Sequence, residues 1–277
     1  MSQSKSQGFS LIELIVVIVI VGILATMTTS IITLPVNSYL DLQRRTTLVD
    51  TAELTLRRMQ RDIRRALPNS VRITGGTVIE MLHVVEGGRY RSQLDTTPSA
   101  VTAGCGTVAS DVLDFTSADT CFEVTGSLTV FNPTATATPA ESLVIYNLGS
   151  GTADAYSGSN RTTVTNSSNA KVIALNPSLR FPFSSPQQRF FIVDTPITYR
   201  CASNQLLRYS GYAIAAAQPN PPSVTGQIQA DKIDSCLFAY SPGSASRSGL
   251  VTLTITLTDA KGESVQLMHQ VHVDNLP

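Results

Sequence analysis

The chain has 277 residues, and its twenty basic and twenty acidic residues give a formal net charge of zero. A balanced charge provides no whole-chain excess of positive charge, so we expect no nucleic-acid partner. About 210 residues remain after the N-terminal helical region described below. They suffice for one sizeable globular domain or two small ones, and we favour one.

A long apolar run near the N-terminus dominates the sequence. Residues 8–25 read GFSLIELIVVIVIVGILA, and a short polar leader with one basic residue, Lys5, precedes them. After Glu13 no charged residue or histidine occurs from Leu14 through Leu34, a stretch of 21 positions. As a helix this stretch would be about 31 Å long, which is enough to cross the hydrocarbon core of a bilayer.

Two conventional interpretations explain only part of this run. A secretory signal peptide would have a basic leader, a shorter apolar core and a cleavage site with small residues, which residues 23–26 could supply. Glu13 argues against it, because an acid near the bilayer centre costs about 2.5–3.5 kcal/mol and usually has a use. A plain single-pass anchor explains the length but gives no role to Glu13 or Gly8.

A third interpretation accounts for all of these features. The string KSQGFSLIEL, residues 5–14, resembles the cleavage site of type IV prepilins and pseudopilins. The resemblance implies that residues 1–8 are a leader peptide, and that prepilin peptidase cuts between Gly8 and Phe9 and methylates the new amino terminus. It also implies that Glu13 pairs with the terminal amine of a neighbouring subunit during assembly. A carboxylate in apolar surroundings gains stability chiefly from an opposite charge.

The next part of the sequence predicts a longer helix in two parts, a transmembrane or filament-core helix over residues 9–35 and an amphipathic helix over residues 36–67. Pro35 lies at the junction and is expected to bend the helix, because the helical pattern resumes at once. Pro68 and Asn69 supply the stop signal. The apolar positions form one stripe at helical steps: Val36, Leu40, Leu48, Ala52, Leu56, Met59, Ile63 and Leu67.

Arginine is dense in the second part, where seven of the twenty basic residues lie between positions 44 and 65. Two pairs of opposite charge stand four positions apart and can form ion pairs, namely Glu53 with Arg57 and Arg58 with Asp62. Arg61, Arg64 and Arg65 have no obvious local partner. They are either a solvated face or a contact surface for acidic residues of neighbouring subunits. Nucleic acid is disfavoured again, because this stretch lacks aromatic residues for stacking.

Four cysteines lie at positions 105, 121, 201 and 236. An even number in a chain that crosses the membrane predicts disulfides, although sequence alone allows three connectivities. We expect Cys105 with Cys121 and Cys201 with Cys236, since this pairing closes the shortest loops. Zinc ligation or a redox pair are the alternatives, but the chain has no C-x-x-C and no histidine close to a cysteine in sequence.

Residues 68–277 are expected to form a β-rich globular head, because short β-rich runs alternate with turn signals. The clearest signal is the alternation of residues 251–273, a hairpin with one buried face. We also expect a strand at 112–115, a turn at 86–89 and an exposed loop at 149–170, where small polar residues dominate. The predicted fold class is α+β, with a long N-terminal helix packed on an antiparallel sheet.

An enzyme would need a constellation of reactive residues, and the sequence offers none. No G-x-S-x-G, Walker A, G-x-G-x-x-G or H-E-x-x-H string occurs. His269 and His272 are three apart, which on a strand places them on opposite faces, so they cannot hold one metal together. His269 lies on the apolar face and is expected to be a core residue. We therefore expect no catalytic residue, no metal and no cofactor.

Two further stretches narrow the resemblance. Residues 56–72, LRRMQRDIRRALPNSVR, and residues 269–274, HQVHVD, resemble the MshO minor pseudopilins of MSHA-type type IV pili. The arginine-rich helix also resembles the J-type minor pseudopilins of type II secretion, which is the second alternative. A membrane-anchored periplasmic enzyme or binding protein is the third.

The first resemblance implies a low-abundance subunit that helps to initiate, assemble or cap the pilus. It would sit in the bacterial inner membrane by a single span, with its head in the periplasm, before it enters a pilus or pseudopilus. Its partners would be prepilin peptidase, the other major and minor pilin subunits, and the pilus assembly platform. The large head favours a tip position, because a bulky domain would be hard to repeat along a tightly packed shaft.

Overall fold

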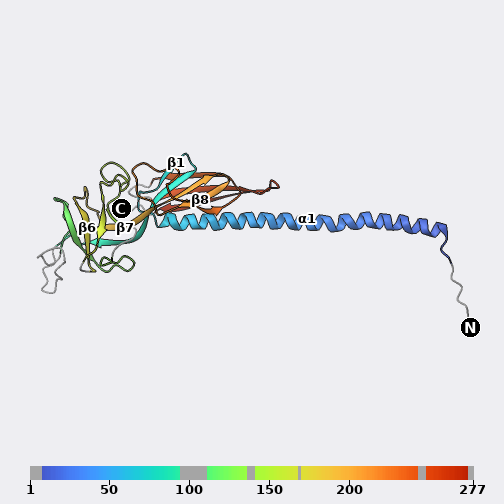
Figure 1. The fold of residues 1–277 in the computed structure, drawn as a ribbon, viewed down its shortest axis with the longest axis horizontal. Coiled ribbons are helices and arrows are strands. Elements are labelled where there is room, and N and C mark those ends of the chain that lie inside the picture. Colours follow the sequence, from blue (N-terminus) through green and yellow to red (C-terminus); the bar gives the residue numbers. More distant parts are fainter. Residues whose placement is uncertain (1–7, 94–110, 136–140, 168–169, 243–247, 274–277) are drawn as a thin grey trace, which may run out of the picture.

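A computed structural model of the chain describes residues 8–93, 111–135, 141–167, 170–242 and 248–273. It consists of one long helix, α1, whose C-terminal part lies along a β-rich head while the remainder extends away from it (Figure 1). Helix α1 spans Leu11–Arg64, 54 residues, and is continuous through Pro35. At 1.5 Å per residue it is about 81 Å long. The predicted α+β class, with a long helix packed on an antiparallel head, is confirmed.

The apolar stripe of the sequence decides which part of α1 meets the head. Leu48, Ala52, Leu56, Met59 and Ile63 are all buried, at helical spacing on one face. The described side chains of residues 11–43 are exposed, and we call this segment the stalk.

Helix α1 ends at Arg64, three residues before the predicted end at Leu67. The N–H of Leu67 donates to the carbonyl of Leu82, and Ala66 forms a β-bridge with His83. The chain therefore leaves the helix because its backbone pairs with a strand of the head.

The described part of the head has twelve strands: β1 (Arg72–Thr74), β2 (Val78–Tyr90), β3 (Asp119–Thr125), β4 (Ser142–Ile145), β5 (Arg161–Thr165), β6 (Val172–Leu179), β7 (Arg189–Ala202), β8 (Gln205–Tyr209), β9 (Gln227–Ala230), β10 (Ile233–Ser241), β11 (Gly249–Thr258) and β12 (Ser264–Val273). The first nine form one sheet in the order β1-β2-β3-β6-β5-β4-β7-β8-β9, and β2 also pairs with β7. The extra pairing closes β2, β3, β6, β5, β4 and β7 into a ring, while β10, β11 and β12 form a separate sheet.

Two main apolar cores follow from this topology. The ring encloses an aromatic core with Tyr90, Phe122 and Phe190, and the last two rings pack edge to face at 5.6 Å. The other core joins α1 to the three-stranded sheet and to the stalk-side halves of β2 and β7. Figure 1 shows β8 alongside α1 and β6 beyond its C-terminal end, so the ring is the part of the head farthest from the stalk.

The C-terminal hairpin is confirmed. Strand β11 alternates strictly between buried and half-buried residues, and every residue from Gly249 to Thr258 pairs with β12. The apolar side chains of this alternation fill the core beneath α1.

The predicted turn at residues 86–89 is wrong, because β2 runs through it to Tyr90. Gly87 and Gly88 stand opposite Phe191 and Phe190 of β7. A Cβ atom on Gly88 would lie 2.5 Å from Cζ of Phe190. The two glycines therefore make room for aromatic rings across a continuous strand pair.

The exposed loop expected at residues 149–170 is also wrong. The segment contains β5, and Ala155, Tyr156 and Asn160 are buried. Side-chain amides replace missing backbone partners: Asn147 Oδ1 accepts from the N–H of Ala155 at 2.9 Å, and Asn160 Nδ2 donates to the carbonyl of Ile145 at 3.1 Å. Hydrogen bonds of this kind let polar residues line an interior, although Asn160 Oδ1 itself has no partner among the described residues.

The strand predicted at 112–115 does not form. Leu113 is buried, but the residues around it have no regular structure. Asp114 accepts hydrogen bonds from the N–H and hydroxyl of Thr116 and from the hydroxyl of Ser117. These local bonds hold a turn that competes with strand pairing.

Candidate functional site

The bond between Gly8 and Phe9 lies outside the helix. Helix α1 begins at Leu11, and the side-chain oxygen of the N-cap residue Ser10 accepts a hydrogen bond from the N–H of Ile12 at 3.3 Å. Among the described residues, nothing lies within 4 Å of a Cβ atom placed on Gly8, and Phe9 is 75% exposed. The expected cleavage point is therefore an unhindered, non-helical peptide.

Glu13 lies in the first turn of α1, where the unpaired N–H groups of a helix favour a negative charge. It is the single charged residue of the window Leu11–Thr28, whose mean hydropathy is 2.7. All residues of this window are exposed. By length and composition the window could cross a membrane, and Glu13 would then lie close to one end of the span.

The structure separates the expected site residues into two groups. Gly8, Phe9 and Glu13 gather at the N-terminal end of α1, whereas Arg61 follows Glu13 by 48 positions on the same helix. That separation corresponds to about 72 Å along the helix axis. The two groups therefore cannot act on one ligand within a single chain.

Arg61, Arg64 and Arg65 lie at the C-terminal end of α1 and are exposed. Within the described residues, their guanidinium groups form no ion pair or hydrogen bond. Positive charge near a helix C-terminus is favoured by the helix dipole, which accounts for part of this enrichment. Both interpretations of these arginines, a solvated face and a subunit contact, are compatible with this exposure.

Residues 3–29 match the prokaryotic N-terminal methylation motif. This match supports a type IV pilin-like precursor. The match covers the cleavage point, Glu13 and most of the apolar run, and the head lies outside it. No curated protein and no solved structure gives a significant match.

The methylation motif of a pilin-like precursor implies cleavage by prepilin peptidase and assembly with other pilins. The exposed apolar stalk supports membrane anchoring followed by incorporation into a pilus. The individual roles of Gly8, Phe9 and Glu13 stay predictions.

The described part of the head contains the expected disulfide between Cys201 and Cys236. Cys201 at the end of β7 is bonded to Cys236 in β10, with the two Cα atoms 6.4 Å apart. This bond links the nine-stranded sheet to the three-stranded sheet. Cys105 lies outside the described residues, so its pairing with Cys121 stays a prediction.

Of the two ion pairs predicted on α1, one is confirmed and one is wrong. Arg57 Nε lies 2.7 Å from Glu53 Oε1, as expected. Asp62 does not pair with Arg58, because its Oδ2 accepts hydrogen bonds from the Tyr199 hydroxyl at 2.7 Å and from Arg208 Nε at 2.8 Å. These partners come from β7 and β8, which sequence spacing along the helix could not reveal.

His269 lies on the face of β12 that packs toward α1, but it is not an apolar core residue. Its Nε2 lies 3.1 Å from Glu53 Oε2, and the side chain is half-buried. The neighbouring His272 is exposed on the opposite face. The expected separation of the two histidines is confirmed.

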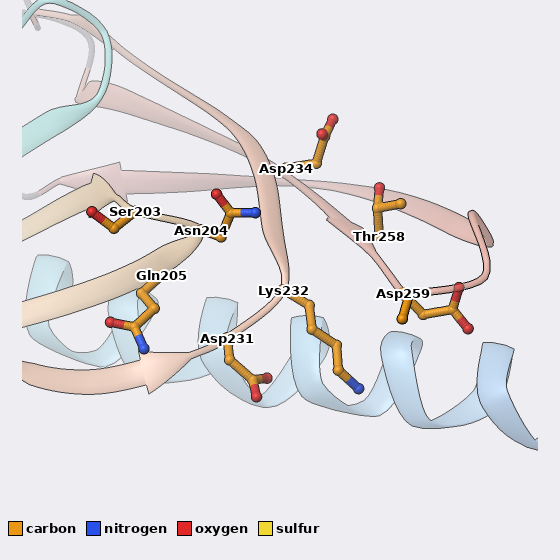
Figure 2. Close-up of a pocket in the computed structure, with 9 residues that line it drawn as sticks. Ser203, Asn204, Gln205, Asp231, Lys232, Asp234, Thr258 and Asp259 are labelled. Carbon is orange, nitrogen blue, oxygen red and sulfur yellow. The ribbon is translucent and has the colours of Figure 1, made fainter.

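A recess of about 450 Å³ lies among three turns on the stalk side of the head. In Figure 2, Lys232 extends toward α1 and Asp234 points away from it. Asp259 lies 3.4 Å from Arg44 Nε and accepts hydrogen bonds from the N–H groups of Lys261 and Glu263. The Arg44–Asp259 contact fastens the β11–β12 turn to the helix, and the two backbone hydrogen bonds hold the turn itself.

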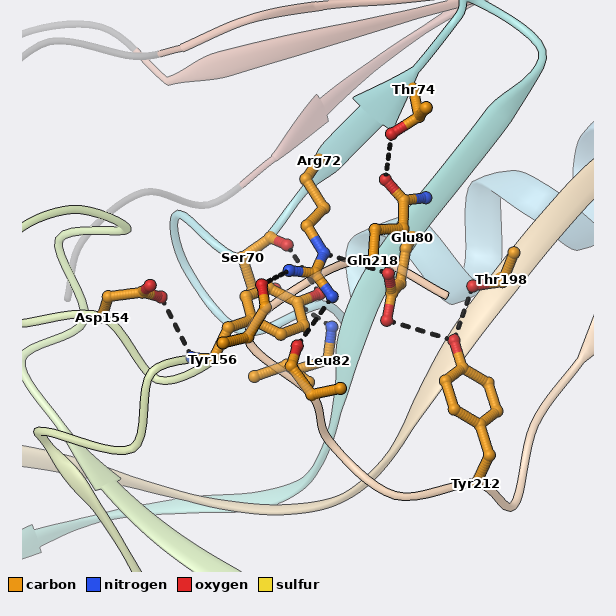
Figure 3. A network of polar contacts seen from close by, with 12 residues as sticks. Ser70, Arg72, Thr74, Glu80, Leu82, Asp154, Tyr156, Thr198, Tyr212 and Gln218 are labelled. Atoms are coloured by element: carbon orange, nitrogen blue, oxygen red, sulfur yellow. Dashed lines mark hydrogen bonds and ion pairs between the residues drawn. The ribbon is translucent and has the colours of Figure 1, made fainter. Parts of the chain in front are cut away.

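A buried polar network joins strands β1 and β2 to loops that are distant in the sequence (Figure 3). Arg72 Nε lies 3.0 Å from Glu80 Oε2, and its guanidinium group covers the ring of Tyr156 at 3.6 Å. The Tyr212 hydroxyl donates to Glu80 Oε1 at 3.2 Å. Burial raises the pKa of Glu80, and Arg72 partly opposes that effect. The buried carboxylate of Glu80 is therefore paired with a cation, as expected for a charge in the interior.

Sequence reasoning missed Tyr199 and Arg208, which the fold brings to the arginine-rich end of α1. Asp62 and Arg208 are 146 positions apart in sequence. Tyr199 and Arg208 are opposite each other in the β7–β8 pair, and the packing of the head against α1 brings both to Asp62. No local motif in the chain could have indicated this contact.

Proposed function

We propose that the protein is a minor pilin or pseudopilin that helps to initiate, assemble or cap an MSHA-type type IV pilus. The observation that carries the proposal is the exposed apolar stalk with Glu13 as its single charge within Leu11–Thr28, directly after the Gly8–Phe9 bond. A stalk with this composition suits a membrane first and a packed helical filament afterwards. The methylation motif supports the same order of events.

In the proposed mechanism, prepilin peptidase removes residues 1–8 and methylates the amino group of Phe9. The stalk stays in the inner membrane, with the head in the periplasm, until the assembly platform moves the subunit into the filament. Glu13 then pairs with the terminal amine of a neighbouring subunit. In apolar surroundings, each of these charges is costly without its partner. The two subunits therefore pack most stably at the axial position that brings Glu13 to the amine, so the ion pair also fixes their register.

The large head supports a minor, terminal role. The twelve strands that the structure describes, in two sheets, lie beside and beyond the end of α1, and a closely packed shaft has little room to repeat them. We propose a structural role and no enzymatic one. A J-type minor pseudopilin of type II secretion is the second candidate, and the arginine-rich end of α1 favours it.

The variant Glu13→Ala tests the assembly role. We expect the variant to be inserted and cleaved normally but to be depleted from sheared pili, because the neighbour's amine loses its partner. Glu13→Asp is the matched control, since it keeps the charge and should retain more incorporation. Normal incorporation of Glu13→Ala would contradict the proposal.

Deletion of the protein separates the two candidates. Loss of the MSHA-type pilus with normal protein secretion is expected for the first candidate. Loss of secretion with normal pili would favour the second. Immunogold labelling at pilus ends would support the terminal position, and even labelling along the shaft would contradict it.

A further inference from the structure

A groove of about 290 Å³ lies between the last turns of α1 and strands β7, β8 and β9. We call it the basic groove. It is lined by Arg58, Arg61 and Asp62 of α1, Tyr199 of β7, Arg208 of β8, and two glutamines of β9.

The groove has more positive than negative charge. Its three guanidinium groups face a single carboxylate, that of Asp62. This carboxylate already accepts hydrogen bonds from Arg208 and Tyr199. Burial and the nearby Asp62 raise the pKa of Tyr199, so the phenol is neutral and adds no negative charge. Two positive charges are therefore left without a carboxylate in the described groove.

Arg58 and Arg61 carry these two charges. Arg58 Nη1 donates to the neutral side-chain oxygen of Gln229 at 3.3 Å, and Arg61 has no side-chain partner among the described residues. Because they stand three positions apart on α1, they face the same side of the helix and repel each other. The helix dipole favours positive charge on the last turn of α1. Arg208 comes from the sheet, and Asp62 balances its charge.

From this arrangement we propose that the basic groove binds a carboxylate side chain on the head of a neighbouring pilin-like subunit. The inference rests on the proposed function as a pilus subunit. Guanidinium groups form paired, charge-assisted hydrogen bonds with carboxylates, and a partly enclosed groove strengthens them relative to open solvent. The bound carboxylate also removes the repulsion between Arg58 and Arg61.

Distance from the membrane selects a protein partner over a lipid headgroup. Arg58 follows Leu34, the last residue of the expected membrane-crossing stretch Leu14–Leu34, by 24 positions on one continuous helix. This separation is about 36 Å along the axis. Phospholipid headgroups at the membrane surface are therefore out of reach, whereas the proposed function brings the heads of other subunits next to this one.

Peptide binding to the full-length protein in detergent tests the chemistry. The probe is a capped tetraglutamate peptide, with capped tetraglutamine as its uncharged match, and binding is measured by calorimetry. We expect tetraglutamate to bind and Arg58→Gln/Arg61→Gln to weaken it by about 10-fold or more, because two charge-assisted contacts are lost. Arg64→Gln/Arg65→Gln removes the same charge outside the groove and should change affinity by less than about 3-fold.

Three outcomes would overturn the proposal. They are equal binding of the two peptides, equal weakening by the two double variants, and binding of inorganic phosphate as tight as that of tetraglutamate. The second outcome would mean a diffuse charge effect, and the third a general anion site.

A cellular measurement separates this inference from the proposed function. Arg58→Gln/Arg61→Gln should leave cleavage and methylation intact, so the mature mass should change only by the substitutions, while incorporation into pili falls. Normal incorporation at the correct mature mass would overturn the groove proposal alone. Absence of the mature mass in the unaltered protein would instead contradict the proposed function.

Discussion

The carboxylate of Glu80 on β2 is fully buried, and its Oε2 lies 3.0 Å from Nε of Arg72 on β1. The same guanidinium group covers Tyr156 and donates to the carbonyls of Ala215 and Ala216. One arginine thus joins the first strands of the head to two distant loops. Arg72 stabilises the head less through the attraction of the ion pair itself than by neutralising the buried charge of Glu80.

Arg72→Met should therefore destabilise the head by about 3–5 kcal/mol, because Glu80 would be left buried without a cation. Chemical unfolding of the full-length protein, followed by circular dichroism, measures the loss. The double variant Arg72→Met/Glu80→Gln should recover part of it, since the remaining pair is uncharged. A double variant as unstable as the single one would show that lost packing, and not the buried charge, is the cause.

Gly88→Ala should destabilise the ring of strands by about 1–3 kcal/mol, because the new methyl group would overlap the ring of Phe190. Gly87→Ala is the control and should destabilise the ring of strands less. Its Cβ atom would lie 3.3 Å from Cδ1 of Phe191, and the Phe191 side chain is only half-buried. Thermal unfolding should rank the two variants in that order. Equal stability of Gly88→Ala and the unaltered protein would contradict the close approach of β2 and β7.

Asp111 should make the stability of the head depend on pH. Burial, followed by repulsion from Asp119 and Glu123, raises the pKa of Asp111 to about 6. A raised pKa means that the folded state holds the proton more tightly than the unfolded chain. This contribution to stability is therefore complete below the ordinary pKa and is lost as the pH rises through about 6.

Asp111→Asn removes this contribution and its pH dependence. We expect the melting temperature of the variant, relative to that of the unaltered protein, to rise between about pH 4 and pH 7. Asp234→Asn, at an exposed position, controls for the loss of one carboxylate. A difference that stays constant with pH, or falls, would contradict the raised pKa.

Local sequence patterns were sufficient to predict the helix and the C-terminal hairpin. The apolar stripe from Leu48 to Ile63 predicted the face of α1 that packs on the head, and strict alternation predicted β11 and β12. Both patterns arise because one face of the helix or strand is buried against a single apolar core. They need no knowledge of distant residues.

Amino-acid composition gave a wrong prediction where side chains from distant parts of the sequence complete the structure. Residues 149–170 lack a long apolar run, yet Tyr156 is buried because its hydroxyl donates to the carbonyl of Ser70 at 3.0 Å and Arg72 covers its ring. The basic groove was missed for the same reason, since Arg208 reaches α1 only through the sheet. The N-terminal residues form a local motif, and their spacing alone was informative.

Gly8→Ala should block processing, because prepilin peptidase would meet a side chain beside the bond that it cuts. The uncleaved precursor should accumulate in the membrane and be absent from pili. Ser10→Ala is a control that alters the nearby N-cap while keeping the cleavage point. Efficient cleavage of Gly8→Ala would contradict the assigned role of the glycine.

The intact mass of the protein purified from membranes of its native host tests the central claim most directly. The account predicts a chain of residues 9–277 that carries one additional methyl group on the amino terminus of Phe9. A mature chain that starts after Ala25 would establish an ordinary signal peptide and contradict the account. An unprocessed chain that retains residues 1–8 would contradict it as well.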